Sequence, residues 1–191
     1  MIAPYRLRMP LVIAATACAA FMGCYVQSIH PLYSDRTTLF DPALIGTWVA
    51  EEDDEFVFTL EDTTRGTYRL ISDESGATAR FQAVLTEIDN VRFLDIFPDD
   101  PDNGNGFYRD HLMRVHSIVR LERSADTLSV SDFDAEWLST MASQKKISID
   151  HVSLDGAVLL TGSTESLQAF VRKYAHTAEA FSDPIRFRRA L

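Results

Sequence analysis

The chain has 191 residues, a formal net charge of −10 at pH 7, and 46% hydrophobic against 24% charged residues. This length is typical of one folded domain that buries a proper hydrophobic core. A surface with such an excess of acidic groups repels phosphate backbones and anionic lipid head groups, which argues against nucleic acid as a partner.

The start of the chain has the layout of an export signal. Two arginines precede an apolar run, and the small residue Gly23 stands directly before Cys24. Lipoprotein signal peptidase requires a small residue before the modified cysteine, and the four residues that end at Cys24 resemble its recognition sequence. We therefore predict a lipoprotein signal peptide at residues 1–23 and acyl chains, palmitate included, on Cys24 that anchor the protein to a membrane.

Two alternatives compete with this assignment. Cys18 also follows small residues, but cleavage there would leave a shorter apolar run. An uncleaved anchor is the other alternative, and the apolar run falls short of the ~20 residues that span a bilayer. After Cys24 comes Tyr25 rather than the aspartate that usually retains lipoproteins at the inner membrane. The predicted location is therefore the cell envelope, at the outer membrane if the cell has one, with the domain facing the periplasm or the exterior.

Cleavage before Cys24 would leave 168 residues with a net charge of −12 and a single cysteine. Because that cysteine carries the lipid, no disulfide can form within the chain, and packing must stabilise the domain. Residues 24–38 are predicted to be a tether, and residues 39–191 a single domain. Ile29, Leu32 and Tyr33 are rather apolar for a free linker, so this segment could instead lie along the domain.

Alternating apolar residues from Trp48 onward, with turn residues between the runs, are typical of antiparallel strands. Asp89-Asn90 and Asp155-Gly156 each predict a tight hairpin turn. A meander of about nine strands has two exposed edges, and closing it into a barrel or a closed sandwich removes them. The expected strands lie at residues 56–60, 67–71, 79–85, 91–97, 112–123, 127–133, 147–152, 157–161 and 185–189.

Two helices are expected to interrupt the strand pattern and to pack outside the barrel. Asp134 can cap a helix that runs to Met141, because its carboxylate can accept from the free N–H groups of the first turn. Ser163 or Thr164 can cap a second helix. That second helix has one apolar stripe, which is expected to dock on the barrel wall and consists of Leu167, Phe170, Val171 and Tyr174.

The stretch from Asp41 to Trp48 starts the domain. Asp41 before Pro42 predicts a short helical turn. Gly46 then allows an unusual backbone conformation, and Trp48 opens the first strand. This helical turn followed by Gly-x-Trp resembles the start of the lipocalins and related small barrels. The resemblance implies a lipocalin-like barrel that Gly46 and Trp48 close at one end, beneath a basic residue from the far end of the chain. The candidates for that residue are Arg186, Arg188 and Arg189.

The chain also resembles a group of uncharacterised bacterial envelope lipoproteins. That group carries Pro-Leu-Tyr, then Asp-Pro-Ala-Leu, then Gly-Thr-Trp, and these motifs stand here at residues 31–33, 41–44 and 46–48. The resemblance covers most of the mature chain. It implies an exported, lipid-anchored protein but no particular activity.

Candidate metal and cofactor sites are few. The acidic loop at residues 99–106 gathers the oxygen ligands that calcium prefers, but its spacing does not fit an EF-type loop. An irregular calcium site there stays an alternative to a solvated, turn-rich loop. His111 and His116 are an odd number of residues apart, so on one strand they would face opposite sides. We therefore predict no metal site and no cofactor.

Four polar residues are candidates for ligand contacts. Asp95 shares a strand face with Phe93, where burial next to aromatic rings would raise its pKa. Arg114, His116 and Arg120 share one face of the following expected strand. The four side chains either line a cavity and bind a ligand, or they form an outer charged face and pair with one another.

No nucleophile elbow, zinc-binding motif or other catalytic spacing occurs, so we predict no catalytic residues and place a hydrolase behind two non-enzymatic functions. The first is a binding module whose barrel holds a small apolar or amphipathic ligand, as the lipocalin resemblance implies. The second is a structural or interaction protein of the cell envelope with a filled barrel core. The residues that could fill a small barrel are Phe56, Phe58, Phe81 and Phe93. The sequence names neither the ligand nor a protein partner.

Overall fold

The computed structural model describes residues 26–51, 56–63, 66–100, 105–154 and 157–190. The predicted signal peptide, Cys24 and Tyr25 lie outside these ranges. The strands are β1 (Gln27–Ser28), β2 (Thr38–Leu39), β3 (Gly46–Ala50), β4 (Phe56–Asp62), β5 (Tyr68–Glu74), β6 (Ala77–Ile88), β7 (Val91–Pro98), β8 (His116–Ser124), β9 (Thr127–Asp132), β10 (His151–Leu154), β11 (Ala157–Leu160) and β12 (Ile185–Arg189). The helices are the 3-10 turns η1 (Pro42–Leu44) and η2 (Ala178–Ala180) and the α-helices α1 (Gly106–Arg109), α2 (Ala135–Ser143) and α3 (Thr164–Tyr174).

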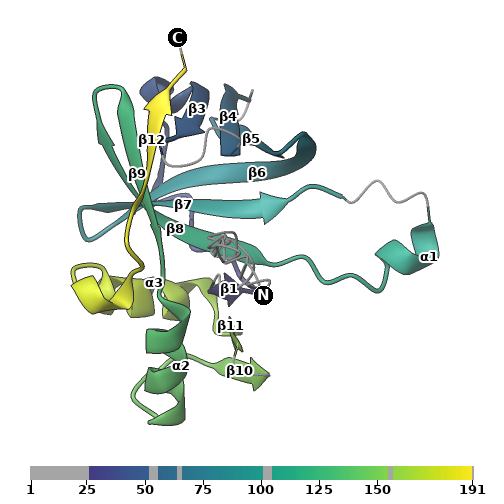
Figure 1. Cartoon of the computed structure of the whole chain (residues 1–191). Helices are drawn as coiled ribbons and strands as arrows, with labels where there is room; N and C mark the ends of the chain where they lie inside the picture. The colour runs from purple at the N-terminus through teal and green to yellow at the C-terminus, as the bar shows by residue number, and fades with distance from the viewer. Residues whose placement is uncertain (1–25, 52–55, 64–65, 101–104, 155–156, 191) are drawn as a thin grey trace, which may run out of the picture.

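Eight strands close into an antiparallel barrel (Figure 1). Each strand from β3 to β9 pairs with the next one along the chain. The last strand, β12, pairs with both β3 and β9 and so completes the ring. Closure leaves these eight strands without a free edge, and the predicted antiparallel barrel is confirmed.

The barrel wall separates two hydrophobic cores, because successive side chains on a strand point to opposite faces. The inner core includes Trp48, Leu94 and Phe187. The outer core includes Phe93 and Ile118 from the outward faces of β7 and β8, packed against the helices. One strand such as β7 therefore contributes to both cores.

The helices α2 and α3 and the β10–β11 hairpin cover one side of the barrel (Figure 1). Asp134 caps α2 by accepting from the Trp137 N–H at 2.6 Å, and Ser163 caps α3 by accepting from the Ser166 N–H at 3.4 Å. All four residues of the predicted apolar stripe on α3 are buried. Both predicted helices are thus confirmed, and α1 is an additional short one.

The segment predicted as a tether, residues 24–38, lies along the barrel from Val26, its first described residue. Strand β1 pairs antiparallel with β8 and parallel with β11, and β2 pairs with β6. Val26 and Leu32 are buried in the outer core, and the Leu32 N–H donates to Asp95 Oδ2 at 2.6 Å. This is the second of the two arrangements that the sequence left open, and burial of the apolar residues explains it.

The turn at Asp89-Asn90 is the tight hairpin that the sequence predicted. Both residues have positive φ, 54° and 62°, as a type I′ turn requires. The other predicted turn, Asp155-Gly156, lies outside the described residues. The strand expected at 147–152 begins only at His151, because the chain before it enters the outer core as irregular structure.

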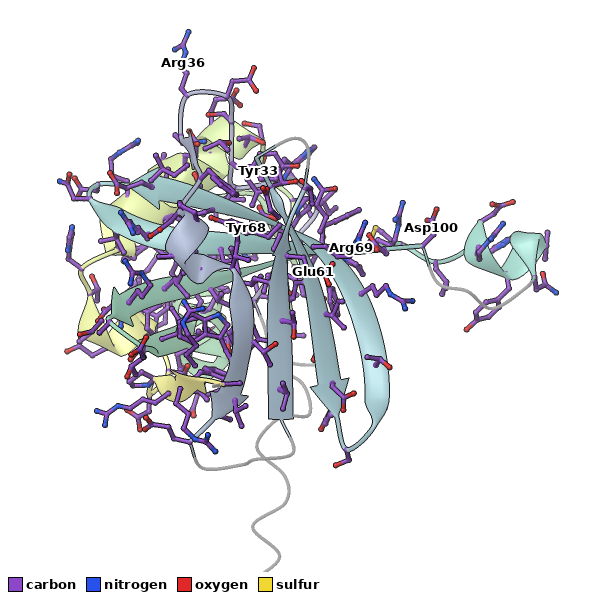
Figure 2. The ribbon with its side chains drawn as sticks, turned by 90° about the horizontal axis from the view of Figure 1, so that it is seen from above. Tyr33, Arg36, Glu61, Tyr68, Arg69 and Asp100 are labelled. Carbon is purple, nitrogen blue, oxygen red and sulfur yellow. The ribbon has the colours of Figure 1, made fainter. Side chains whose placement is uncertain are left out.

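A projecting arm connects β7 to β8 and carries α1 at its tip (Figures 1 and 2). The strand expected at 112–123 begins only at His116, because the residues before it belong to this arm. Phe107, Tyr108 and Met113 on the arm are 78%, 58% and 63% exposed. The predicted loop at 99–106 falls partly outside the described residues. Within the described part of the chain, no helix has the length and apolar character needed to cross a membrane.

Candidate functional site

One end of the barrel is closed around Trp48. Its side chain is fully buried, and the indole N–H donates to the Leu44 carbonyl of η1 at 3.0 Å. The Arg189 guanidinium lies over the indole ring, 4.3 Å from its centroid, and its Nη1 donates to the Ile45 carbonyl at 2.8 Å. Gly46 has a φ of 140°, and a Cβ there would lie 2.4 Å from Arg189 Nη1. Arg189 is therefore the C-terminal arginine that stacks on the tryptophan, and the positive φ of Gly46 favours glycine at the position beneath it.

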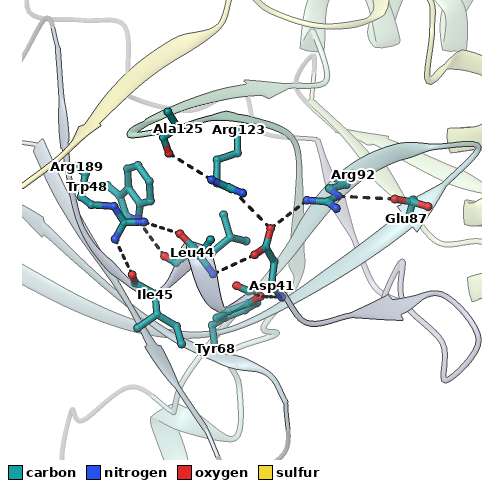
Figure 3. A network of polar contacts seen from close by, with 11 residues as sticks. Asp41, Leu44, Ile45, Trp48, Tyr68, Glu87, Arg92, Arg123, Ala125 and Arg189 are labelled. Atoms are coloured by element: carbon teal, nitrogen blue, oxygen red, sulfur yellow. Dashed lines mark hydrogen bonds and ion pairs between the residues drawn. The ribbon is translucent and has the colours of Figure 1, made fainter.

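Asp41 joins η1 to three strands of the barrel (Figure 3). Its Oδ1 accepts from the Ala43 N–H at 3.0 Å and so caps η1. Its Oδ2 accepts from Arg92 Nη1 on β7 at 3.1 Å and lies 3.7 Å from Arg123 Nε on β8. The Tyr68 hydroxyl of β5 donates to the Asp41 carbonyl at 3.1 Å, and burial raises the pKa of this phenol, which keeps its proton in place. These contacts hold η1 in place across the end of the barrel and so close that end.

The rest of the barrel interior contains a cavity of about 330 Å³. This volume lies at the lower end of the ~300–1,000 Å³ that is typical of small-molecule sites. Its walls are mostly apolar side chains from β4 to β9 and β12, among them Leu70, Ile96, Val119 and Val130. The exposed Glu74 at the end of β5 also lines the cavity, so the cavity reaches the surface there.

The phenylalanines that could have filled the barrel do not all point inward. Phe58 meets Phe187 edge to face at 4.6 Å between ring centroids, and both rings line the cavity, as does Phe81. Phe93 faces the outer core instead, because its neighbour on β7, Leu94, points inward. The side chain of Phe56 lies outside the described residues. The interior is therefore only partly filled.

Asp132, the last residue of β9, brings a half-buried carboxyl group to the cavity lining, where the other carboxyl group, that of Glu74, is exposed. Its main chain is held by Ser182, whose Oγ accepts from the Asp132 N–H at 3.2 Å and whose N–H donates to the Asp132 carbonyl at 2.9 Å. Within the described residues, no side chain pairs with the carboxylate. Burial without a compensating charge raises the pKa of Asp132 from 3.8 to about 7.

The four residues predicted to contact a ligand lie elsewhere, and none of them lines this cavity. Asp95 and His116 form a buried pair on the outer face of β7 and β8, with 2.6 Å between Oδ1 and Nδ1. Arg114 lies over the ring of Phe97 at the base of the arm. Arg120 lies over a ring of the outer core, 4.2 Å from its centroid. Their predicted role in ligand binding stays a prediction.

Among the residues that the structure describes, no three side chains of His, Cys, Asp or Glu are placed to share a metal ion. The Asp95–His116 pair also contacts the Leu32 N–H and the ring of Phe97, which ties the N-terminal segment to the barrel. Its contacts are those of a structural clip.

The sequence interpretation missed Asp132, although a signal for it exists. Leu128, Val130 and Asp132 alternate along one predicted strand, so a carboxyl group shares a face with two apolar residues. The partners of Asp41 had no comparable signal, because Tyr68 and Arg92 are 27 and 51 residues away along the chain.

Comparison with known proteins adds no family to this description. No family model matches the chain, and no curated protein or solved structure gives a significant match.

Proposed function

We propose that this chain is an exported, lipid-anchored lipoprotein of the cell envelope whose barrel binds a small apolar or amphipathic ligand. The observation that carries the ligand proposal is the partly empty interior, about 330 Å³ with mostly apolar walls and an opening at Glu74. Apolar surface that stays in contact with water inside a barrel is unfavourable, and an apolar ligand would remove it from water.

The envelope part of the proposal rests on the first 24 residues of the sequence. An apolar run with basic residues before it and Gly23-Cys24 after it is typical of a lipoprotein leader. Several acyl chains on one cysteine give stable anchoring, whereas a single chain gives only marginal binding.

Native mass spectrometry of the processed protein, purified from its own host, tests ligand binding directly. We expect a mass increment of one small molecule that organic solvent removes. The Val119→Trp variant should lose this increment, since the larger side chain would occupy the cavity in which Val119 lies.

The matched control is Val152→Trp, the same substitution at a residue of β10 that is 53% exposed and outside the barrel. It should retain the bound molecule. An increment that is equal in both variants would place the ligand outside the cavity and contradict the proposal.

A structural or interaction protein of the envelope is the second candidate. It is favoured by the arm, where Phe107 and Met113 expose large apolar side chains. Exposed apolar groups that gather on one projection are typical of protein contact sites. A Phe107→Ser variant whose barrel still binds its ligand, but which no longer co-purifies with a partner protein, would favour this second function.

A further inference from the structure

We propose that Asp132 is the polar recognition group of the barrel cavity and that it selects amphipathic ligands with a cationic amine head group over those with an anionic or neutral head. The inference rests on the proposed ligand-binding function, since it concerns the same cavity. It is suggested by the position of Asp132, whose carboxyl group lines the cavity without a partner among the described residues.

The position of Asp132 is the first step of the argument. Asp132 is opposite Val119 on β8 in the strand register, and both side chains line the cavity. Its main chain is fixed by Ser182, so the carboxyl group projects from a rigid part of the wall. Within the described residues, no lysine, arginine or histidine lines the cavity, and none pairs with this carboxylate.

The environment of the carboxyl group is the second step. The groups around it in the cavity are apolar, apart from the hydroxyls of Ser72 and Ser117 and the carboxyl of Glu74. Glu74 is exposed and is the other titratable group that faces the cavity. A carboxylate that is mostly buried without a partner is unfavourable, and an ion pair with a ligand would satisfy it.

The chemistry of the ligand follows from these two steps. An ammonium head brings both the positive charge and the hydrogen-bond donors that a carboxylate accepts. A carboxylate head would be repelled by Asp132 and Glu74, and a hydroxyl head could donate one hydrogen bond without charge. The apolar walls would bury the tail whichever head is present, so the head group decides the preference.

Titration of the purified, processed protein with octylamine, octanol and octanoate tests the proposal, because these three probes share one apolar tail. At about 0.15 M salt, long-range attraction between the acidic protein and a cation is largely screened beyond about 8 Å. We expect octylamine to bind roughly 10-fold or more tightly than octanol, and octanoate to bind more weakly than octanol. In Asp132→Asn, octylamine should lose roughly that 10-fold advantage while octanol binds as before.

Glu74→Gln is the matched control, since it removes a carboxyl group from the open end of the same cavity. It should leave the preference for octylamine within roughly threefold of the original. A preference that survives Asp132→Asn, or that Glu74→Gln removes, overturns the assignment to Asp132.

The outcomes separate this inference from the proposed function. If octanol binds but octylamine has no advantage, the inference is wrong and the proposed function stands. If none of the three probes binds, both are wrong. The ranking of the probes on the unaltered protein needs no variant, so the inference can be overturned even if Asp132→Asn does not fold.

Discussion

The two tryptophans differ in how much they stabilise the fold. Trp48 is fully buried beneath Arg189, whereas Trp137 is half-buried on α2 and meets Tyr174 edge to face at 4.9 Å. Trp48→Ala should lower the free energy of unfolding by ~3–5 kcal/mol, and Trp137→Ala by clearly less. Urea denaturation of both variants measures the difference. Equal, small losses would mean that the contacts at the closed end contribute little to stability.

Asp132 should make the stability of the barrel depend on pH. Its pKa is raised from 3.8 to about 7 in the folded state, so folding binds a proton between these values and stability falls as pH rises through that window. Both states are protonated below about 4, where the effect disappears. Above about 7 it is complete, and at ~1.4 kcal/mol per pKa unit it is at most ~4 kcal/mol.

Asp132→Asn should therefore stabilise the protein relative to the original chain at about pH 8 and much less at about pH 4. Denaturation midpoints at several pH values measure this trend. Glu74→Gln, at an exposed carboxyl group, serves as the comparison and should show little of it. A stability difference for Asp132→Asn that does not change with pH would mean that the carboxyl group is not desolvated.

At the scale of elements, Asp95 connects the N-terminal segment to the barrel. It is 1% exposed and accepts from the Leu32 N–H while pairing with His116. Asp95→Ala would leave both donors buried without a partner, which costs ~1–3 kcal/mol for each group. We expect amide exchange along residues 26–39 to become roughly 10-fold faster, while β4 and β5 keep their protection.

The control for this clip is Asp183→Ala, at an exposed position outside it. This variant should exchange as the original protein does. If Asp95→Ala accelerates exchange equally in β4 and β5, the pair stabilises the whole barrel and is not specific to the segment.

At the scale of the whole molecule, the proposed lipid anchor on Cys24 would decide where the barrel works. Cys24→Ser should prevent acylation, and the protein should then be released from the membrane or stay unprocessed. Without acyl chains on residue 24, the chain lacks the groups that give stable anchoring. Labelled palmitate and partition into detergent measure the outcome. A Cys24→Ser protein that still takes up palmitate would move the modification to another residue, for which Cys18 is the candidate.

Features that depend on neighbouring residues could be predicted from the sequence. The Asp134 cap needs a carboxyl group three residues before the N–H that it accepts from, and the Asp89-Asn90 turn needs two residues that tolerate positive φ. The alternation of apolar residues likewise predicted most of the strands and, from the number of edges to be removed, a barrel or closed sandwich. These signals are local, so they can be recognised without the fold.

Features that depend on ring closure had to come from the tertiary structure. Asp41 meets Tyr68, Arg92 and Arg123 only because β5, β7 and β8 end around the same turn of η1. Alternation sends Phe93 outward, and the size of the cavity depends on how side chains from several strands meet at the centre. Periodicity identifies which residues share a face of a strand, but closure and packing decide which face points inward and how much space is left.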